Sequence, residues 1–216
     1  MNFINYLTIL IFLTGCSGYR LQKKTNPFAQ YSISSLRVPM FYNKSNLGSY
    51  SGLFTKEIFY TLTEFNDLNL VSDQGMSDAV LIGVLESSEM RKDSIRTHGS
   101  QSVEEHFGAD VIGENRNQFT VPRANEIKMS LRIIVIKHPT KSEIEFLQTG
   151  LGASAISSKV IFNEKIPLST VYNLKKYQGE NISVLGTQNR GVYRESMKLL
   201  AKQAADNFRN MILYAF

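Results

Sequence analysis

Apolar residues recur along the chain with the spacing of a helix in two places. The first set repeats at intervals of three or four residues: Phe54, Ile58, Leu62 and Phe65. This spacing puts the four side chains on one face of a helix. The same spacing from Tyr193 to Ala215 predicts a C-terminal helix of roughly 22 residues. The opposite side of this second helix is charged and carries Arg194, Lys198, Lys202, Asp206 and Arg209.

Four other segments have the pattern of strands. Residues 33–41 alternate imperfectly between apolar and polar, with Pro39 near the end of the run. Residues 78–86 contain seven uninterrupted apolar or glycine residues, which predicts a central strand buried on both faces. From Glu126 to Ile136 the period is two, as in a strand of an antiparallel sheet. Residues 159–172 are interrupted by Pro167 and are expected to form an edge or bulged strand.

The remaining segments are polar. Residues 91–125 form a long interval that we interpret as a functional loop, a flap or simply a mobile segment. Residues 175–190 are expected to be a second loop. Residues 141–148 could continue the preceding strand after a turn at His138-Pro139. The order β-α-β-β-β-α predicts a single α+β domain over residues 31–216. We expect a two-layer sandwich of a mainly antiparallel sheet, with four or more strands, and two amphipathic helices.

Composition and charge narrow the possible functions. The 216 residues are 43% hydrophobic and 20% charged, which is ordinary for a globular chain. A net charge of +5 without long cationic runs argues against a nucleic-acid partner but leaves an anionic one open. The sequence lacks the motifs of a nucleophile elbow, a phosphate-binding loop and a zinc protease. We therefore expect no enzyme activity and no cofactor.

One acidic cluster in the long interval could be imagined as a metal site. It consists of Glu104, Glu105, His106 and Asp110. No second His or Cys lies at the spacing that a metal ion needs, so a solvated loop is the favoured interpretation and we expect no metal.

The amino terminus has the features of an export signal. The apolar stretch from Phe3 to Leu13 is eleven residues, too short to span a bilayer but suited to the core of a secretory signal. Leu13-Thr14-Gly15-Cys16 resembles the lipobox of bacterial lipoproteins. That resemblance implies a signal peptide over residues 1–15, a lipid on Cys16 and a tether over residues 16–30. The alternative is an incidental buried thiol behind an ordinary N-terminal helix or strand.

Two cations fall on one face of the predicted strand from Glu126. Lys128 and Arg132 are four residues apart, which places them about 14 Å from each other along that face. With Ile134 and Ile136 beyond them, this face would suit a ligand that has phosphate groups and acyl tails. The alternative is that a helix covers the face and the cations are solvated at its rim.

Three motifs behind the lipobox resemble the LptE-type lipopolysaccharide-assembly lipoproteins. Cys16 is followed by Gly18-Tyr19-Arg20-Leu21, similar to the family's opening C-G-(aromatic)-x-L. Residues 36–43 (LRVPMFYN) resemble its first strand, which runs into P-x-F-x-N, and residues 77–83 (SDAVLIG) resemble its second strand, A-D-a-x-L-x-G. With the long final helix, the similarity covers nearly the whole mature chain.

This resemblance implies a noncatalytic lipoprotein of the outer membrane, on its periplasmic side. Ser17 in place of Asp after the lipid-bearing cysteine favours that destination by similarity to enterobacterial lipoproteins. Members of the family lie inside the LptD β-barrel, help it to assemble and bind lipopolysaccharide. The interval 91–125 departs from the family, so we transfer no binding residues from it. Lys128 and Arg132 therefore rest on charge and spacing alone.

A second group of lipoproteins offers an alternative. Penicillin-binding-protein activators and CsgG-like periplasmic proteins also begin with a strand, v-x-x-F-x-N, and then a helix. Leu70-Val71-Ser72-Asp73 partly matches the segment that follows in these proteins. This resemblance would imply a role in regulating peptidoglycan synthesis or in secretion.

Overall fold

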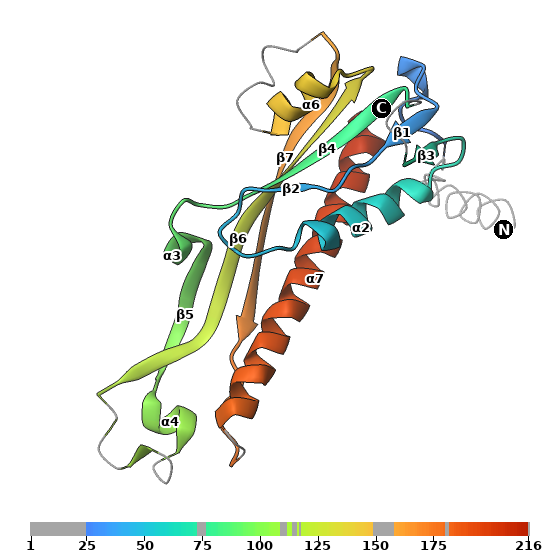
Figure 1. Cartoon of the computed structure of the whole chain (residues 1–216). Helices are drawn as coiled ribbons and strands as arrows, with labels where there is room; N and C mark the ends of the chain where they lie inside the picture. Colours follow the sequence, from blue (N-terminus) through green and yellow to red (C-terminus); the bar gives the residue numbers. More distant parts are fainter. Residues whose placement is uncertain are drawn as a thin grey trace, which may run out of the picture.

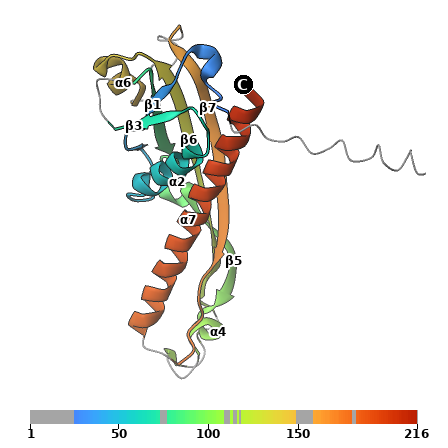
Figure 2. The ribbon, with the colours of Figure 1, turned by 90° about the vertical axis from the view of Figure 1, so that its right-hand side faces the viewer.

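A computed structural model describes residues 25–72, 77–108, 112, 113, 116, 118–148, 158–179 and 182–215. The predicted signal peptide, the lipobox and Cys16 lie outside these described residues, as do Asp73 and Asp110. Figures 1 and 2 show an elongated molecule built around two long strands and one long helix.

The sheet is organised by its longest strand, β6 (Thr120–Lys137). Its one edge pairs along most of its length with β7 (Val160–Asn173). Its other edge pairs first with β5 (Ile95–Ser102) and then with β4 (Ala79–Glu86), so these two strands lie end to end. All three pairings are antiparallel. β7 continues through Pro167, which is paired with Ser130. Among the described strands β7 pairs only with β6, so the predicted edge position is confirmed and agrees with the presence of a proline.

Three short parallel strands complete the seven-stranded sheet. β1 (Ser35–Arg37) lies between β4 and β3 (Asn69–Val71), and β2 (Tyr42–Asn43) pairs with the far end of β4. The parallel pairings involve two or three residues each, whereas the antiparallel ones run along whole strands. The predicted α+β class with a mainly antiparallel sheet is therefore confirmed.

The two predicted amphipathic helices pack on the same face of the sheet. α2 (Ser51–Thr63) buries Phe54, Ile58 and Leu62, as its spacing predicts. α7 (Ile182–Ala215) buries Met197, Leu200 and Phe208. Its C-terminal half crosses α2 (Figure 1). At 1.5 Å per residue the 34 residues of α7 extend about 51 Å. No helix in the described part of the chain combines the length and hydropathy needed to cross a bilayer.

The prediction of a loop over residues 91–125 is wrong for most of that interval. It contains α3 (Arg91–Ser94), β5, α4 (Val103–Phe107) and the first residues of β6. β5 escapes prediction because all its residues from Arg96 to Ser100 are exposed, leaving no apolar alternation to detect. Pairing with β6, rather than local preference, makes this segment a strand.

Residues 141–148 form the helix α6 (Lys141–Gln148), not the predicted continuation of a strand. Thr140 begins it: its hydroxyl accepts from the Glu143 N–H, and the Glu143 carboxylate accepts from the Thr140 N–H at 2.7 Å. Leu147 then packs on the sheet face opposite α2 and α7. At this end the two-layer sandwich gains a short third layer.

The second predicted loop is shorter than expected, because α7 already begins at Ile182. Gly186 and Gly191 disfavour helix in this region, which explains the prediction. The helix is held by tertiary contacts instead: Leu185 is buried, and the Asn189 amide oxygen accepts from the Lys175 N–H at 2.7 Å.

The folded domain also begins earlier than predicted. Phe28 is fully buried in the core and precedes the short 3-10 helix η2 (Ala29–Tyr31). The buried Asn26 amide donates to the Ile33 carbonyl at 2.6 Å and reaches the Asp67 carbonyl at 3.3 Å. Residues 26–30 therefore belong to the fold rather than to a tether.

Two regions of the molecule differ in construction. In the region that we name the body, residues 130–137 of β6 pair with β4, and α2, α6 and α7 from Tyr193 onward cover the sheet. In the region that we name the arm, residues 120–127 of β6 pair with β5, with α4 and the first turns of α7 beside them. Figures 1 and 2 show the arm as the narrower end, with α4 near its tip.

Candidate functional site

The alternation of β6 divides its side chains between two environments, as predicted. Ile127, Leu131 and Ile133 are buried on the side of α2 and α7. Lys128 and Arg132 lie on the opposite side, which we name the open face because no helix of the described chain covers it at these two residues. The alternation of side chains along β6 thus agrees with the prediction that Lys128 and Arg132 share a face.

The apolar part of that prediction is wrong. Ile134 and Ile136 lie on the same side as Arg132, but they are 1% and 0% exposed. They pack with Val80, Ile82 and Leu147 beneath α6. These two isoleucines are therefore unable to receive acyl tails unless α6 moves away.

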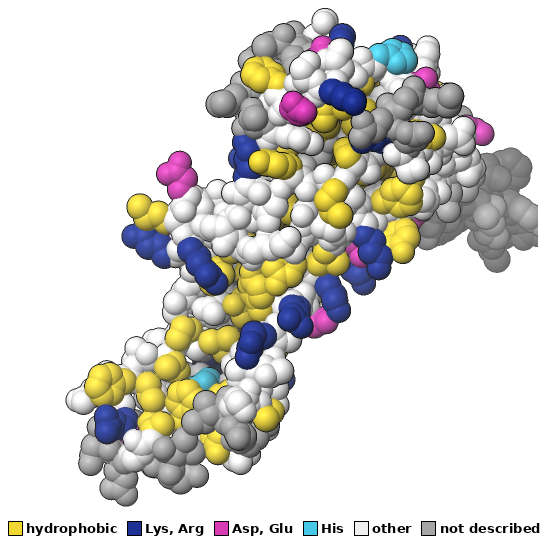
Figure 3. All heavy atoms as spheres, viewed as in Figure 1, with side chains coloured by type: hydrophobic (Ala, Val, Ile, Leu, Met, Phe, Trp, Pro, Cys, Tyr) yellow, Lys and Arg dark blue, Asp and Glu magenta, His cyan; other side chains and the backbone are white. Residues whose placement is uncertain are grey.

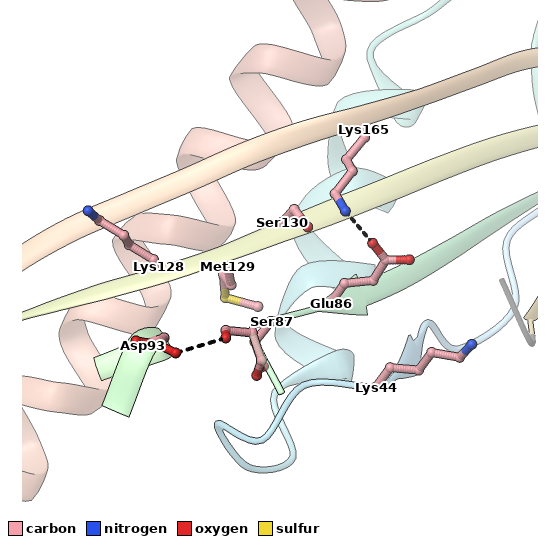
Figure 4. A pocket seen from close by; sticks show the side chains of 9 residues that line it. Lys44, Glu86, Ser87, Asp93, Lys128, Met129, Ser130 and Lys165 are labelled. Atoms are coloured by element: carbon pink, nitrogen blue, oxygen red, sulfur yellow. Dashed lines mark hydrogen bonds and ion pairs between the residues drawn. The ribbon is translucent and has the colours of Figure 1, made fainter. Parts of the chain in front are cut away.

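A hollow of about 500 Å³ opens on this face where β4 ends and β5 begins (Figure 4). β6 pairs with β5 as far as Ile127 and with β4 from Ser130, and α3 occupies the gap between those strands. Apart from Met129 the lining residues are polar or charged, and they come from five segments: Lys44, Glu86, Ser87, Ser88, Asp93, Lys128, Met129, Ser130 and Lys165. Three ammonium groups and three hydroxyls are the donors that phosphate oxygens require.

Each of the lysines on β6 and β7 that line the hollow has a carboxylate partner. The Lys165 Nζ lies 2.6 Å from the Glu86 Oε2, and the Lys128 Nζ lies 3.1 Å from the Glu126 Oε2. The lysine side chains remain 60% and 43% exposed. Exposed ion pairs stabilise a protein by only about 0–1 kcal/mol, so an incoming anion can replace either carboxylate at small cost.

Positive charge is concentrated by the register of β6 and β7. Arg132 is directly opposite Lys165, and like charges in such a pair are destabilising. The Arg132 Nε donates to the Asn163 amide oxygen at 3.0 Å, while Glu86 holds Lys165. Arg132 thus lies beside the hollow, two residues after Ser130 on β6. A ligand with two anionic groups could contact both Lys128 and the Arg132–Lys165 pair.

The sequence selects Lys128 and Arg132 as candidates and places Lys137, Lys159 and Lys165 only near the ends of neighbouring segments, and it does not indicate Lys44. Lys165 joins Arg132 only through the strand register, and Lys44 arrives from the turn after β2. Lys137 and Lys159 do not line the hollow. Lys137 donates to the Tyr31 carbonyl, and Lys159 pairs with Glu143 at 2.8 Å. The Lys159 ammonium, with the Thr140 N–H, lowers the pKa of Glu143 to about 2.

The described members of the acidic cluster, Glu104, Glu105 and His106, have other partners or surroundings than a metal ion. Glu105 pairs with Lys176 at 2.6 Å, and the buried His106 Nδ1 lies 2.7 Å from the Gln101 Nε2. Burial, followed by nearby Lys176, lowers the pKa of His106. In the described residues, no three His, Cys, Asp or Glu side chains are grouped closely enough to hold a metal ion.

The opposite face of the molecule carries a second set of cations. The exposed residues Arg194, Lys198 and Lys202 follow α7, as its helical spacing predicts, and Figure 3 shows Lys and Arg side chains along this helix. Acids balance part of this row, because Lys198 pairs with Glu195 at 2.6 Å and Arg209 pairs with Glu64. Lys202 and Arg209 line a smaller hollow of about 230 Å³ together with the acids Glu57, Glu64 and Asp206. Lys198 and Lys202 serve below as control positions.

Comparison with known proteins gives only distant structural likenesses. No protein-family model matches the sequence, and no curated protein matches it. Lipoprotein B from Nitrosomonas europaea is 10% identical with a TM-score of 0.41, covering 88% of this chain and 86% of its own. Rare lipoprotein B from Shewanella oneidensis is 8% identical with a TM-score of 0.37, covering 83% and 97%.

A third likeness is to a Xanthomonas campestris protein of the family DUF330, which is 6% identical with a TM-score of 0.42 and 84% coverage of both chains. The two neighbours above are bacterial lipoproteins by name. At these identities and TM-scores the likenesses assign neither a family nor a function to this chain.

Proposed function

We propose that this protein is a lipoprotein anchored through Cys16 that acts with an LptD-type β-barrel in lipopolysaccharide assembly at the outer membrane. The open face of the sheet is the proposed contact for the phosphate groups of the glycolipid. The observation that carries this role is the hollow lined by Lys44, Lys128, Lys165 and three serines, with Arg132 beside it. The protein would bind and position its ligand without changing it chemically.

Two motifs behind the family resemblance meet in space, which supports the proposal. Phe41, from the segment P-x-F-x-N, is buried against Gly83, the glycine of A-D-a-x-L-x-G. A Cβ at Gly83 would overlap the Phe41 ring, so the two positions require each other. Asn43 ends the first motif, and its amide oxygen accepts a hydrogen bond from the Ser45 N–H at 2.9 Å. This bond shapes the turn that contains Lys44, which lines the hollow.

Charge reversal on the open face tests the ligand. Lys128→Glu combined with Arg132→Glu should weaken binding of purified lipopolysaccharide about tenfold or more, because charge-assisted hydrogen bonds are lost. The difference should shrink as salt is raised. The matched control is Lys198→Glu with Lys202→Glu, which makes the same change of net charge on α7 and should leave binding unchanged.

A second variant is expected to act in the opposite direction. Glu86→Gln removes the carboxylate that occupies Lys165, and it should tighten binding of lipopolysaccharide but not of its dephosphorylated form. Equal losses in both charge-reversal doubles, or no change in either, would contradict a phosphate contact on the open face.

The anchor and the partner need separate experiments. Cys16→Ala should leave unprocessed precursor without an acyl group, and normal acylation of this variant would refute the anchor. Crosslinking in intact envelopes should trap a much larger β-barrel protein. Capture of a penicillin-binding protein alone would instead support the activator class that shares the strand-helix opening.

A further inference from the structure

A second hollow lies on the α7 side of the sheet, between β7 and the C-terminal turns of α7. It measures about 610 Å³ and is mainly apolar, with walls formed by Phe162, Ile166, Pro167, Met211 and Tyr214. Glu164 is the one charged residue among the described residues that line it. Tyr214 at its rim is 85% exposed, more than any other large apolar side chain of the described chain. We name this surface the β7–α7 groove.

The groove lies at the end of the molecule where the described chain begins. Asn26 donates to the Asp67 carbonyl just after α2, and Glu64 at the end of α2 pairs with Arg209 of α7. Figures 1 and 2 both show the first described residues next to the C-terminal turns of α7. Chain entry, Arg209 and Tyr214 therefore share one end of the body.

The distance from Cys16 to this end is bounded by chain length. Nine residue steps separate Cys16 from Thr25, and a fully extended chain of that length spans at most about 32 Å. An anchor on Cys16 thus holds this end close to the bilayer. The arm is directed away from it along α7, which extends about 51 Å.

We propose that the β7–α7 groove, with Tyr214 at its rim, is the face on which the body rests on the phospholipid bilayer; this rests on the anchor of the proposed function. Tyrosine prefers the headgroup region, where the ring is apolar and the hydroxyl is hydrated. The single charge among the described lining residues keeps the desolvation cost of such contact low.

The absence of tryptophan from the chain makes this contact directly measurable. Tyr214→Trp introduces a single fluorophore at the groove, and Phe119→Trp introduces one in the arm, where Phe119 is 51% exposed. The mature chain is extracted with its anchor and reconstituted in phosphatidylethanolamine and phosphatidylglycerol vesicles. A contact residue about 5–10 Å deep should show about a twofold loss of fluorescence with lipids brominated near the headgroup, and the arm residue none.

The experiment separates failure of the contact from failure of the anchor. The mass of the extracted chain reports the acyl group; if none is present, the one cysteine, Cys16, is coupled to a maleimide lipid and the measurement is repeated. Equal fluorescence of the two variants in brominated and unbrominated vesicles would overturn the proposal. So would quenching of the Phe119→Trp variant alone, or a groove occupied by a second copy, seen as a dimer that forms without vesicles.

Discussion

The body and the arm are built from the same two long strands and the same long helix, but they are stabilised differently. In the body, apolar side chains are buried on both faces of β4, and seven of its eight residues are inaccessible. In the arm, β5 is exposed along most of its length, and polar contacts such as Lys176–Glu105 and Asn189 with Lys175 hold its elements together. We infer that the body supplies most of the stability and that the arm opens more readily.

The two regions are joined through aromatic contacts. Tyr193 of α7 lies edge-on to Tyr50 of the body at 5.8 Å and to Tyr172 of β7 at 5.9 Å, measured between ring centroids. Its hydroxyl donates to the Leu47 carbonyl at 2.9 Å, and burial raises the pKa of Tyr193 to about 12. This cluster couples the position of the arm to the body without extending the core into the arm.

The largest expected effect compares two leucines of one helix. Leu200→Ala, in the body, should lower the free energy of unfolding by about 2–5 kcal/mol because a fully buried side chain leaves a cavity. Leu185→Ala, in the arm, should cost about 2 kcal/mol or less, since the thin arm can close around the gap. Urea unfolding with hydrogen exchange measures both. Equal costs would mean that the arm is packed as firmly as the body.

The next effect in size is expected from a glycine substitution that destabilises the body. Gly83→Ala should destabilise by about 1–3 kcal/mol because the added methyl group overlaps the buried Phe41 ring. Combining it with Phe41→Leu should recover part of the loss. A double variant no more stable than Gly83→Ala alone would show that the contact is not the cause. Thermal unfolding of the four chains gives the answer.

Asp78 is expected to make the body sensitive to acid. Its carboxylate accepts from the N–H groups of Ser34 and Ser35 at 2.9 and 2.8 Å, and these bonds hold its pKa far below the ordinary value. This stabilisation is complete above the unfolded pKa of about 3.9 and is lost as pH falls toward the lower folded pKa. Asp78→Asn should cost about 1–2 kcal/mol at neutral pH and lose less stability below pH 4. Parallel curves of stability against pH would exclude this role.

The smallest effect has the opposite sign and lies in the arm. Gly186 and Gly191 face open space on α7, so alanine meets no neighbour there. Each substitution should stabilise the protein by about 0.5–1 kcal/mol through helix preference. Slower hydrogen exchange confined to residues 182–191 would locate the gain in the arm. Destabilisation by either alanine would mean that this face of the helix has a partner that the body-and-arm description omits.

The sequence predicts the body better than the arm for a physical reason. α2 and β6 have apolar periodicities, and β4 has a continuous apolar run, that arise from burial within each element. Phe54 and Ile133 are therefore recognisable from their own segments alone. β5 and the start of α7 have no such pattern. β5 is a strand because β6 pairs with it, and the first turns of α7 are held by Leu185 and Asn189 against other segments. Local reasoning has no access to these contacts.

The candidate site likewise combines features that local sequence predicts with features that depend on tertiary contacts. Alternation alone places Lys128 and Arg132 on one face. The position of Lys165 opposite Arg132 depends on strand register, and the burial of Ile134 depends on α6 folding back over the sheet. Neither the register nor the fold of α6 over the sheet can be derived from the residues of β6 alone. The alternation of β6 therefore predicts the shared face of Lys128 and Arg132, but not the burial of Ile134.

The most direct measurement of the central claim places a photocrosslinking residue in the hollow itself. Ser130 lines the hollow from β6, two residues from Lys128 and next to β7, which carries Lys165. The exposed Gln203 of α7 serves as the control position. In cells that export lipopolysaccharide, a crosslinker at Ser130 should trap the glycolipid, and one at Gln203 should not. Capture at both positions alike, or at Gln203 alone, would contradict the open face as the binding surface.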